Sequence, residues 1–143
     1  MTILAALMGL ALTQAAAPAA PTPLQVTVPT VPGLTADPTC GGREALTAIA
    51  TCLVTTQAGI ESAVDVLNAD FEAQGWIPAD GRDNRIVYVK RKPEGGCDAF
   101  QLLAFAGGNN LSAPAAPGYL ALAAIPGNIC AAALGAVSPP AAQ

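Results

Sequence analysis

The clearest hydrophobic pattern in the chain lies between residues 46 and 71. Apolar side chains recur there three, four or seven residues apart, at Leu46, Ile49, Leu53, Ile60, Val64, Leu67 and Phe71. Such spacing is typical of one face of an α-helix. Three threonines at 51, 55 and 56, together with Gly59, form helix poorly, so the pattern fits one long helix or two helices broken near residues 55–59. Both interpretations predict a helix over residues 60–74.

The residues after this helix predict its end and the approach to a sheet. Gly75 can adopt the positive φ that commonly follows the last helical turn. Trp76 and Ile77 come next, and we expect both to be anchored in the core. Residues 78–84 are rich in turn formers and predict a loop.

Three later segments, rich in β-branched, aromatic and other apolar residues, predict an antiparallel sheet. Residues 85–92 and 97–105 predict two strands joined by the turn 93–96, and residues 119–125 predict the third strand. Residues 128–134 predict a short final piece. The expected fold class is therefore α+β, with one or two helices packed on a three-stranded antiparallel β-meander that disulfides staple.

The two ends of the chain predict segments outside this domain. Residues 3–12 are apolar, which is a length typical of a signal-peptide core and too short to span a bilayer. Small residues favour cleavage after Ala15, while an uncleaved anchor or a buried N-terminal helix is the alternative. The Ala/Pro-rich residues 16–36 predict a disordered linker, and residues 135–143 predict a disordered tail. The folded domain is expected at 37–134.

Four cysteines, at positions 40, 52, 97 and 130, fit the oxidising compartment to which such a leader would direct the chain. If the last two strands pair around the centre of their loop, partner numbers sum to about 227 and Cys97 faces Cys130 at bridging distance. This favoured bridge leaves Cys40 and Cys52. An unbroken helix from residue 43 would rise about 13–14 Å by Cys52. Either the glycines after Cys40 fold the chain back, or the helix starts later, or the pairing is crossed, and sequence alone does not decide.

The composition excludes several kinds of chemistry. The chain contains no histidine, the commonest general base and metal ligand near neutral pH, so Ser-His-Asp and Cys-His catalysis and His-bearing zinc sites are excluded. The cysteines stand too far apart for a structural zinc site, which draws on pairs roughly two to four residues apart. We therefore expect no metal and no cofactor. The net charge of −4 disfavours nucleic-acid binding, which needs a basic footprint.

Basic residues are concentrated in one short segment. Five of the six in the chain lie within 82–92, namely Arg82, Arg85, Lys90, Arg91 and Lys92. In an acidic chain, such a cluster could bind an anionic partner, for example an envelope polymer, a phospholipid headgroup or an acidic protein surface. The other interpretation is that these charges protect a terminal strand of the meander from edge-to-edge aggregation. Pairing Lys92 with Cys97 would also set Arg91 opposite Asp98 and neutralise one charge.

The carboxylates offer a second class of function. Candidates for the paired acids of a glycoside hydrolase are Asp65, Asp70, Glu72, Asp80 and Asp83. They form no known motif. Asp65 and Glu72 fit the exposed face of an amphipathic helix, and Asp80 and Asp83 fit turn chemistry.

The sequence as a whole favours an exported, periplasmic or secreted, disulfide-bonded module that is not an enzyme and that binds a partner or supports the envelope. The expected partner is an anionic envelope component or protein, with no nucleic acid and no membrane span once the leader is removed. The alternative is a small hydrolase, or a hydrolase accessory, that uses carboxylates.

We expect the mature protein to begin at Ala16 and to contain two disulfides. Intact mass spectrometry should return the mass of residues 16–143 less the hydrogens lost in two disulfides. An alkylating reagent should label no cysteine in denaturant until reductant is added. A full-length mass with four labelled thiols before reduction would contradict both expectations.

Overall fold

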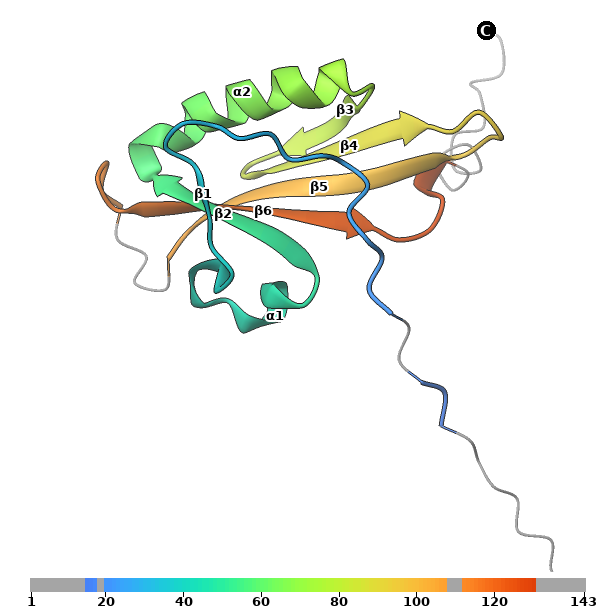
Figure 1. The fold of residues 1–143 in the computed structure, drawn as a ribbon, viewed down its shortest axis with the longest axis horizontal. Helices are drawn as coiled ribbons and strands as arrows, with labels where there is room; N and C mark the ends of the chain where they lie inside the picture. Colours follow the sequence, from blue (N-terminus) through green and yellow to red (C-terminus); the bar gives the residue numbers. More distant parts are fainter. Residues whose placement is uncertain (1–14, 18–19, 108–111, 131–143) are drawn as a thin grey trace, which may run out of the picture.

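The structure is a computed structural model that describes residues 15–17, 20–107 and 112–130. These residues form a six-stranded antiparallel sheet with helix α2 on one face and a short helical layer on the other (Figure 1). In chain order, the elements are β1 (Thr35–Ala36), the 3₁₀ turn η1 (Cys40–Gly42), α1 (Glu44–Thr47), β2 (Ala50–Thr56), the 3₁₀ turn η2 (Gln57–Gly59), α2 (Ile60–Ala73), β3 (Ile77–Arg82), β4 (Arg85–Arg91), β5 (Cys97–Ala106) and β6 (Pro117–Ile125). The sequence-predicted piece at 128–134 and the tail at 135–143 lie largely or wholly outside the described residues.

The strand order β1-β2-β6-β5-β4-β3 confirms the α+β class and corrects its detail. The three predicted strands are β4, β5 and β6, and they lie in the middle of the sheet. One further strand, β3, flanks them on one side, and two more, β2 and β1, flank them on the other. The three-stranded meander was therefore wrong, because half of the sheet comes from segments that the sequence predicted as helix, loop and linker.

Residues 50–56 form strand β2, where the apolar spacing predicted helix. The strand pairs with β6 along its whole length. Its β-branched residues Thr51, Val54 and Thr55 favour extended backbone. Leu53 is buried against one layer and Cys52 against the other. A strand covered on both faces lacks the simple alternation of apolar and polar residues that identifies a half-buried strand.

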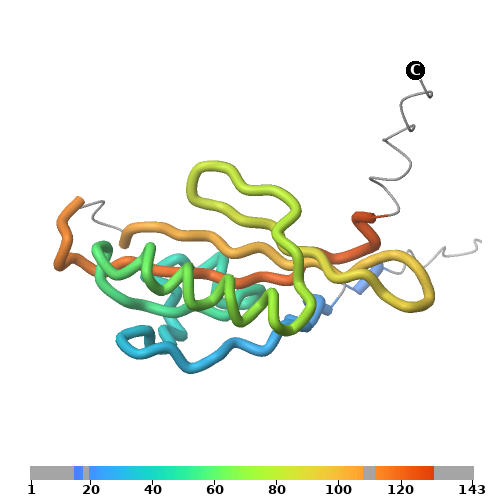
Figure 2. Tube along the Cα trace, turned by 90° about the horizontal axis from the view of Figure 1, so that it is seen from above, coloured from blue at the N-terminus to red at the C-terminus, as the bar shows by residue number. Residues whose placement is uncertain are grey.

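Residues 77–82 form the edge strand β3, where turn formers predicted a loop. Pro78 and a register shift between Pro78 and Asp80 are tolerated there, because an edge strand has no second neighbour to pair with. Figure 2 shows the β3–β4 hairpin at the margin of the sheet. Ile77 is 56% exposed, so the prediction that it anchors the core was wrong, whereas Trp76 is buried as expected.

The main core lies between α2 and the sheet. Leu67 and Phe71 of α2 are fully buried. The Phe71 ring packs edge-on against the rings of Tyr88 at 5.3 Å and Phe100 at 5.2 Å between centroids. Tyr88 stacks on Phe100, and Trp76 meets Phe100 edge-on, both at 4.8 Å. Aromatic pairs of this kind contribute about 0.5–1.5 kcal/mol each beyond the burial of their area.

The second half of the expected linker at 16–36 is part of this core. Leu24, Val26 and Val28 alternate with polar residues, and Val26 is buried in the cluster beneath α2. The side chain of Gln74 holds the backbone of Thr27 from both sides: it accepts from Thr27 N at 3.0 Å and donates to Thr27 O at 2.7 Å. In Figure 1 this blue segment runs across the sheet beside α2.

The hydroxyl of Tyr88 donates to Asn68 Oδ1 of α2. Burial, with the charge of Glu72 as the second cause, raises the pKa of Tyr88 to about 12, from an ordinary value of 10.0. The folded state therefore holds the phenol proton more tightly than the unfolded chain does. It follows that stability is lost as the pH rises from about 10 to about 12.

We expect Tyr88→Phe to lower the free energy of unfolding by about 1 kcal/mol near neutral pH, because it removes one hydrogen bond. Above pH 10 the variant should lose stability less steeply than the original protein, since the phenol whose pKa burial raises has been removed. Urea unfolding at a series of pH values measures both effects. Parallel curves above pH 10 would contradict the assignment to Tyr88.

Candidate functional site

The sheet face opposite α2 is covered only in part. The η1–α1 layer lies over β2 and the adjoining part of β6, where Cys40, Cys52, Phe105 and Ala121 form a small second core. Successive residues of a strand point to opposite faces, so the register places Val87 and Val89 of β4 on this side, next to Gln101 of β5. These three side chains are half-buried, and the Gln101 amide has no hydrogen-bond partner among the described residues. This face is therefore open over β3 and β4, and over β5 only around Gln101, because Cys97, Ala99 and Phe105 of β5 are buried on it.

The strand register and the contact of Arg43 place all four arginines of the chain on this side, and Arg85, at the end of β4, also borders the cavity on the side of α2. Arg85 and Arg91 stand at the two ends of β4, and Arg82 of β3 is the register partner of Arg85. The guanidinium carbon of Arg43 lies 4.3 Å from the centroid of the Phe105 ring. All four are exposed, and within the described ranges none forms an ion pair with a carboxylate. We define the arginine face as these four arginines with Ile77, Asp80, Val87, Val89, Gln101 and Leu103; Asp80 is the register partner of Val87 and is exposed.

Both lysines lie on the side of α2 and already have partners. Lys90 Nζ donates to the backbone oxygen of Gln74 at 2.8 Å and lies 5.9 Å from the centroid of the Trp76 ring. Lys92 Nζ lies 3.5 Å from Asp98 Oδ1. The pleat of the sheet thus divides the predicted basic cluster between two faces.

The register of β4 on β5 is one residue away from the predicted one. Lys90, not Arg91, is the register partner of Asp98, and Arg91 is the partner of Cys97. The predicted neutralisation of Arg91 was therefore wrong, because the aspartate pairs with Lys92 instead. Arg91 keeps its charge free for an external group.

Carboxylates gather at a cavity on the other side of the sheet. This cavity of about 230 Å³ lies between α2 and the β3–β4 turn, has an apolar floor, and is bordered by Glu61, Asp65, Asp83 and Arg85. The predicted acids Asp70, Glu72 and Asp80 do not line it, and Glu61 was missed by sequence reasoning. The three bordering carboxylates are exposed. A general acid needs a carboxyl group in apolar surroundings, and nothing buries these three.

The two disulfides join Cys40 to Cys52 and Cys97 to Cys130, with Cα atoms 5.2 and 5.6 Å apart. The favoured bridge is therefore present, although its predicted register was wrong. Partner numbers in β5 and β6 sum to 224, as for Ala99 and Ile125, rather than about 227. Cys130 instead reaches Cys97 beyond the end of β6, near Asn128, whose Oδ1 accepts from Cys97 N at 3.1 Å.

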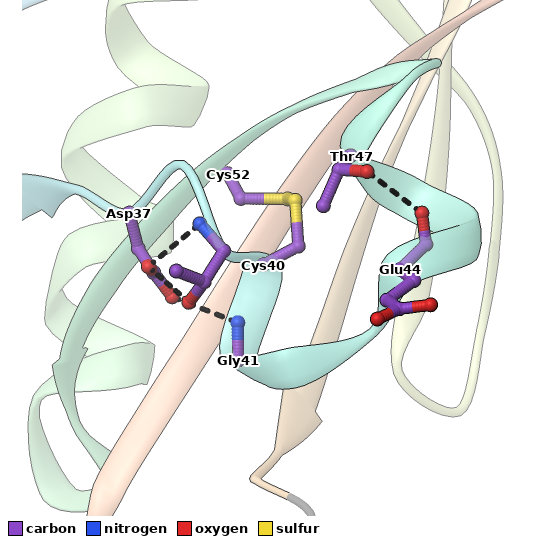
Figure 3. Close-up of a disulfide and its surroundings, with 7 residues drawn as sticks. Asp37, Cys40, Gly41, Glu44, Thr47 and Cys52 are labelled. Carbon is purple, nitrogen blue, oxygen red and sulfur yellow. Dashed lines mark hydrogen bonds between the residues drawn. A yellow bond between two sulfur atoms is a disulfide. The ribbon is translucent and has the colours of Figure 1, made fainter.

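Glycines fold the chain back at the other bridge, as one of the sequence alternatives required. Gly41 and Gly42 have φ values of 61° and 82°, and Cys40 itself has a φ of 51°. The carboxylate of Asp37 holds this turn (Figure 3): Oδ1 accepts from the backbone and hydroxyl of Thr39 at 3.0 and 2.6 Å, and Oδ2 accepts from Gly41 N at 2.7 Å. Sequence reasoning missed Asp37, although an Asp followed two residues later by Thr is typical of such turns.

Within the described part of the chain, no helix combines the length and apolarity needed to cross a membrane. The same residues bring no three Cys, Asp or Glu side chains together as metal ligands. No protein-family model, curated protein or solved structure matches the chain. The arginine face is therefore interpreted from its own chemistry.

The hydrogen bonds from Thr39 and Gly41 lower the pKa of Asp37 below its ordinary value of 3.8. Their stabilisation is complete above that value and is lost as the pH falls below it. We expect Asp37→Asn to lower the melting temperature at neutral pH and to reduce its fall between about pH 4 and pH 2. Asp65→Asn, at an exposed position with no hydrogen-bond partner among the described residues, is the matched control. Indistinguishable pH profiles for the two variants would contradict this role of Asp37.

Proposed function

We propose that this protein is an exported, non-enzymatic binding module whose arginine face holds an anionic partner. The observation that carries the proposal is the collection of four arginines without carboxylate partners around an open, partly apolar strip of sheet. A guanidinium group presents planar donors that match carboxylate, phosphate and sulfate oxygens in pairs. Apolar side chains between such groups add contact area to a partner that also has an apolar part.

The position of β4 supports this interpretation over edge protection. Charges that prevent edge pairing belong on the outermost strand, as β4 was in the predicted meander. In the structure, β3 lies outside β4, and its own protection comes from Pro78 and the register shift beside it. Arg85 therefore projects from a part of β4 that β3 covers, where edge protection does not explain it, whereas Arg91 lies beyond the pairing with β3, which ends at Val89.

The two disulfides are consistent with an extracellular or periplasmic compartment, where thiols oxidise. The apolar run at residues 3–12, which lies outside the described residues, supports export as a sequence-based expectation. The proposed partner is accordingly an anionic polymer, headgroup or protein that is present outside the cytoplasm.

The hydrolase alternative has weaker support. Its best geometry is the cavity bordered by Glu61, Asp65 and Asp83, which are all exposed on the rim above an apolar floor. Such an arrangement lacks a buried carboxyl group to act as general acid. We therefore favour binding over hydrolysis.

The test compares two double variants with the same change in charge. Arg85→Gln with Arg91→Gln removes two cations from the arginine face, and Lys90→Gln with Lys92→Gln removes two from the side of α2. An exposed charge contact contributes about 0.5–1 kcal/mol, so we expect the arginine variant to bind a sulfated dextran matrix roughly 5- to 30-fold more weakly.

The lysine variant should bind the same matrix nearly as well as the original protein. Frontal affinity chromatography at several salt concentrations measures both values, with circular dichroism as the check on folding. Equal losses in the two variants would mean that the matrix senses only total charge, and that result would overturn the proposal.

A further inference from the structure

We propose that the anionic partner of the arginine face is a second copy of this chain, whose helix α2 packs across the face. The inference rests on the proposed function, because it names a partner for the same surface. It joins two surfaces of the molecule that are complementary in charge and comparable in length.

The exposed side of α2 is an acidic helix face. Ile60–Ala73 contains no lysine or arginine, and its exposed residues are Glu61, Ser62, Asp65, Val66, Ala69, Glu72 and Ala73. Residues three and four apart share a face of a helix, so the acids form one row beside a row of small side chains. Val66 in the second row is 48% exposed, a large apolar residue that its own chain leaves in water.

The arginine face carries the opposite charge in a different arrangement. Along β4 the residues on this side are Arg85, Val87, Val89 and Arg91, with a cation at each end and apolar side chains between. The two arginines stand about 20 Å apart along the strand at roughly 3.3 Å per residue. Glu61 and Glu72 stand about 16 Å apart along the helix at 1.5 Å per residue. A helix row with Glu61 and Glu72 near its ends and Asp65 between them can thus lie along a strand with a cation at each end.

The sheet also leaves a space that suits a helix. At Gln101 the open region reaches from β3 to β5, roughly 10 Å between these two strands, which is close to the diameter of a helix with its side chains. Within each copy, α2 covers one face of the sheet, and the neighbour's α2 would cover the open part of the other face.

The contact is heterologous, because it joins two different surfaces. Packing two arginine faces against each other would bring like charges together, which disfavours a two-fold dimer through that surface. A head-to-tail contact leaves one helix and one arginine face free at the ends of each assembly. Such an exposed, flat contact should be weak and sensitive to salt.

The experiment uses two variants that each block one half of the contact. Arg85→Gln with Arg91→Gln blocks the face, and Glu61→Gln with Glu72→Gln blocks the helix. Sedimentation velocity at about 0.1 M and about 0.5 M salt should show the original protein growing in mass with concentration at the lower salt only. Each blocked variant alone should remain monomeric, and the control Lys90→Gln with Lys92→Gln should associate as the original does.

An equimolar mixture of the two blocked variants should form a 1:1 dimer that does not grow further, because only one pair of intact surfaces remains. A mixture that stays monomeric, or a helix-blocked variant that associates like the original, would overturn the inference. An original protein that is monomeric at every concentration, yet binds sulfated dextran through Arg85 and Arg91, would also overturn it and would leave the proposed function standing. The partner would then be another protein or an anionic surface.

Discussion

The contact of Phe71 with Tyr88 and Phe100 determines which side of the sheet faces α2. Because successive residues of a strand point to opposite faces, fixing these two rings beneath the helix turns Val87 and Gln101 to the other side. A slip of one residue in β4 would carry its arginines under α2 and its aromatic ring into water. The aromatic cluster therefore holds both the core and the arginine face in place, and a change in one would disturb the other.

The sequence predicted correctly those helices and strands whose apolar spacing and terminating residues both lie within the segment itself. Residues 60–74 combine helical spacing with a glycine stop, and the structure has α2 and Gly75 there. The strands β4, β5 and β6 are apolar runs bounded by turns. The favoured bridge from Cys97 to Cys130 was also correct, since bridging needs only approximate proximity, which an error of three residues in register did not remove.

The incorrect predictions share a physical cause: in each case, contacts between residues distant in the sequence determine the structure. Leu53 continued a helical period by coincidence, and the pairing of β2 with the distant β6 prevailed over it. The turn formers of β3 are acceptable only because the strand lies at an edge. The division of the basic cluster between two faces depended on the register of β4 on β5, which a pattern of charges along the chain does not contain. Asp37 was missed although Thr39 offers a local signal, because two of its three hydrogen bonds come from backbone N–H groups, which the sequence does not distinguish.

The disulfide between Cys40 and Cys52 stabilises the sheet face opposite α2, which only the η1–α1 layer covers. The layer formed by η1 and α1 contains few buried side chains, so its own hydrophobic contribution is small. A bridge that closes a loop of this length stabilises the fold by about 3 kcal/mol in the chain-entropy account. The border of the arginine face at Arg43 thus depends on a covalent link as much as on packing.

The docking of residues 24–34 against α2 also has a consequence for the order of folding. These residues leave the ribosome before the helix they pack on, and their anchor Gln74 lies 47 residues beyond Thr27. Contacts so distant in sequence form late. Pro29 and Pro32 keep the waiting segment extended in the meantime. The first part of the domain to be synthesised is thus among the last to pack against the core. Its prolines favour the same extended conformation before and after packing.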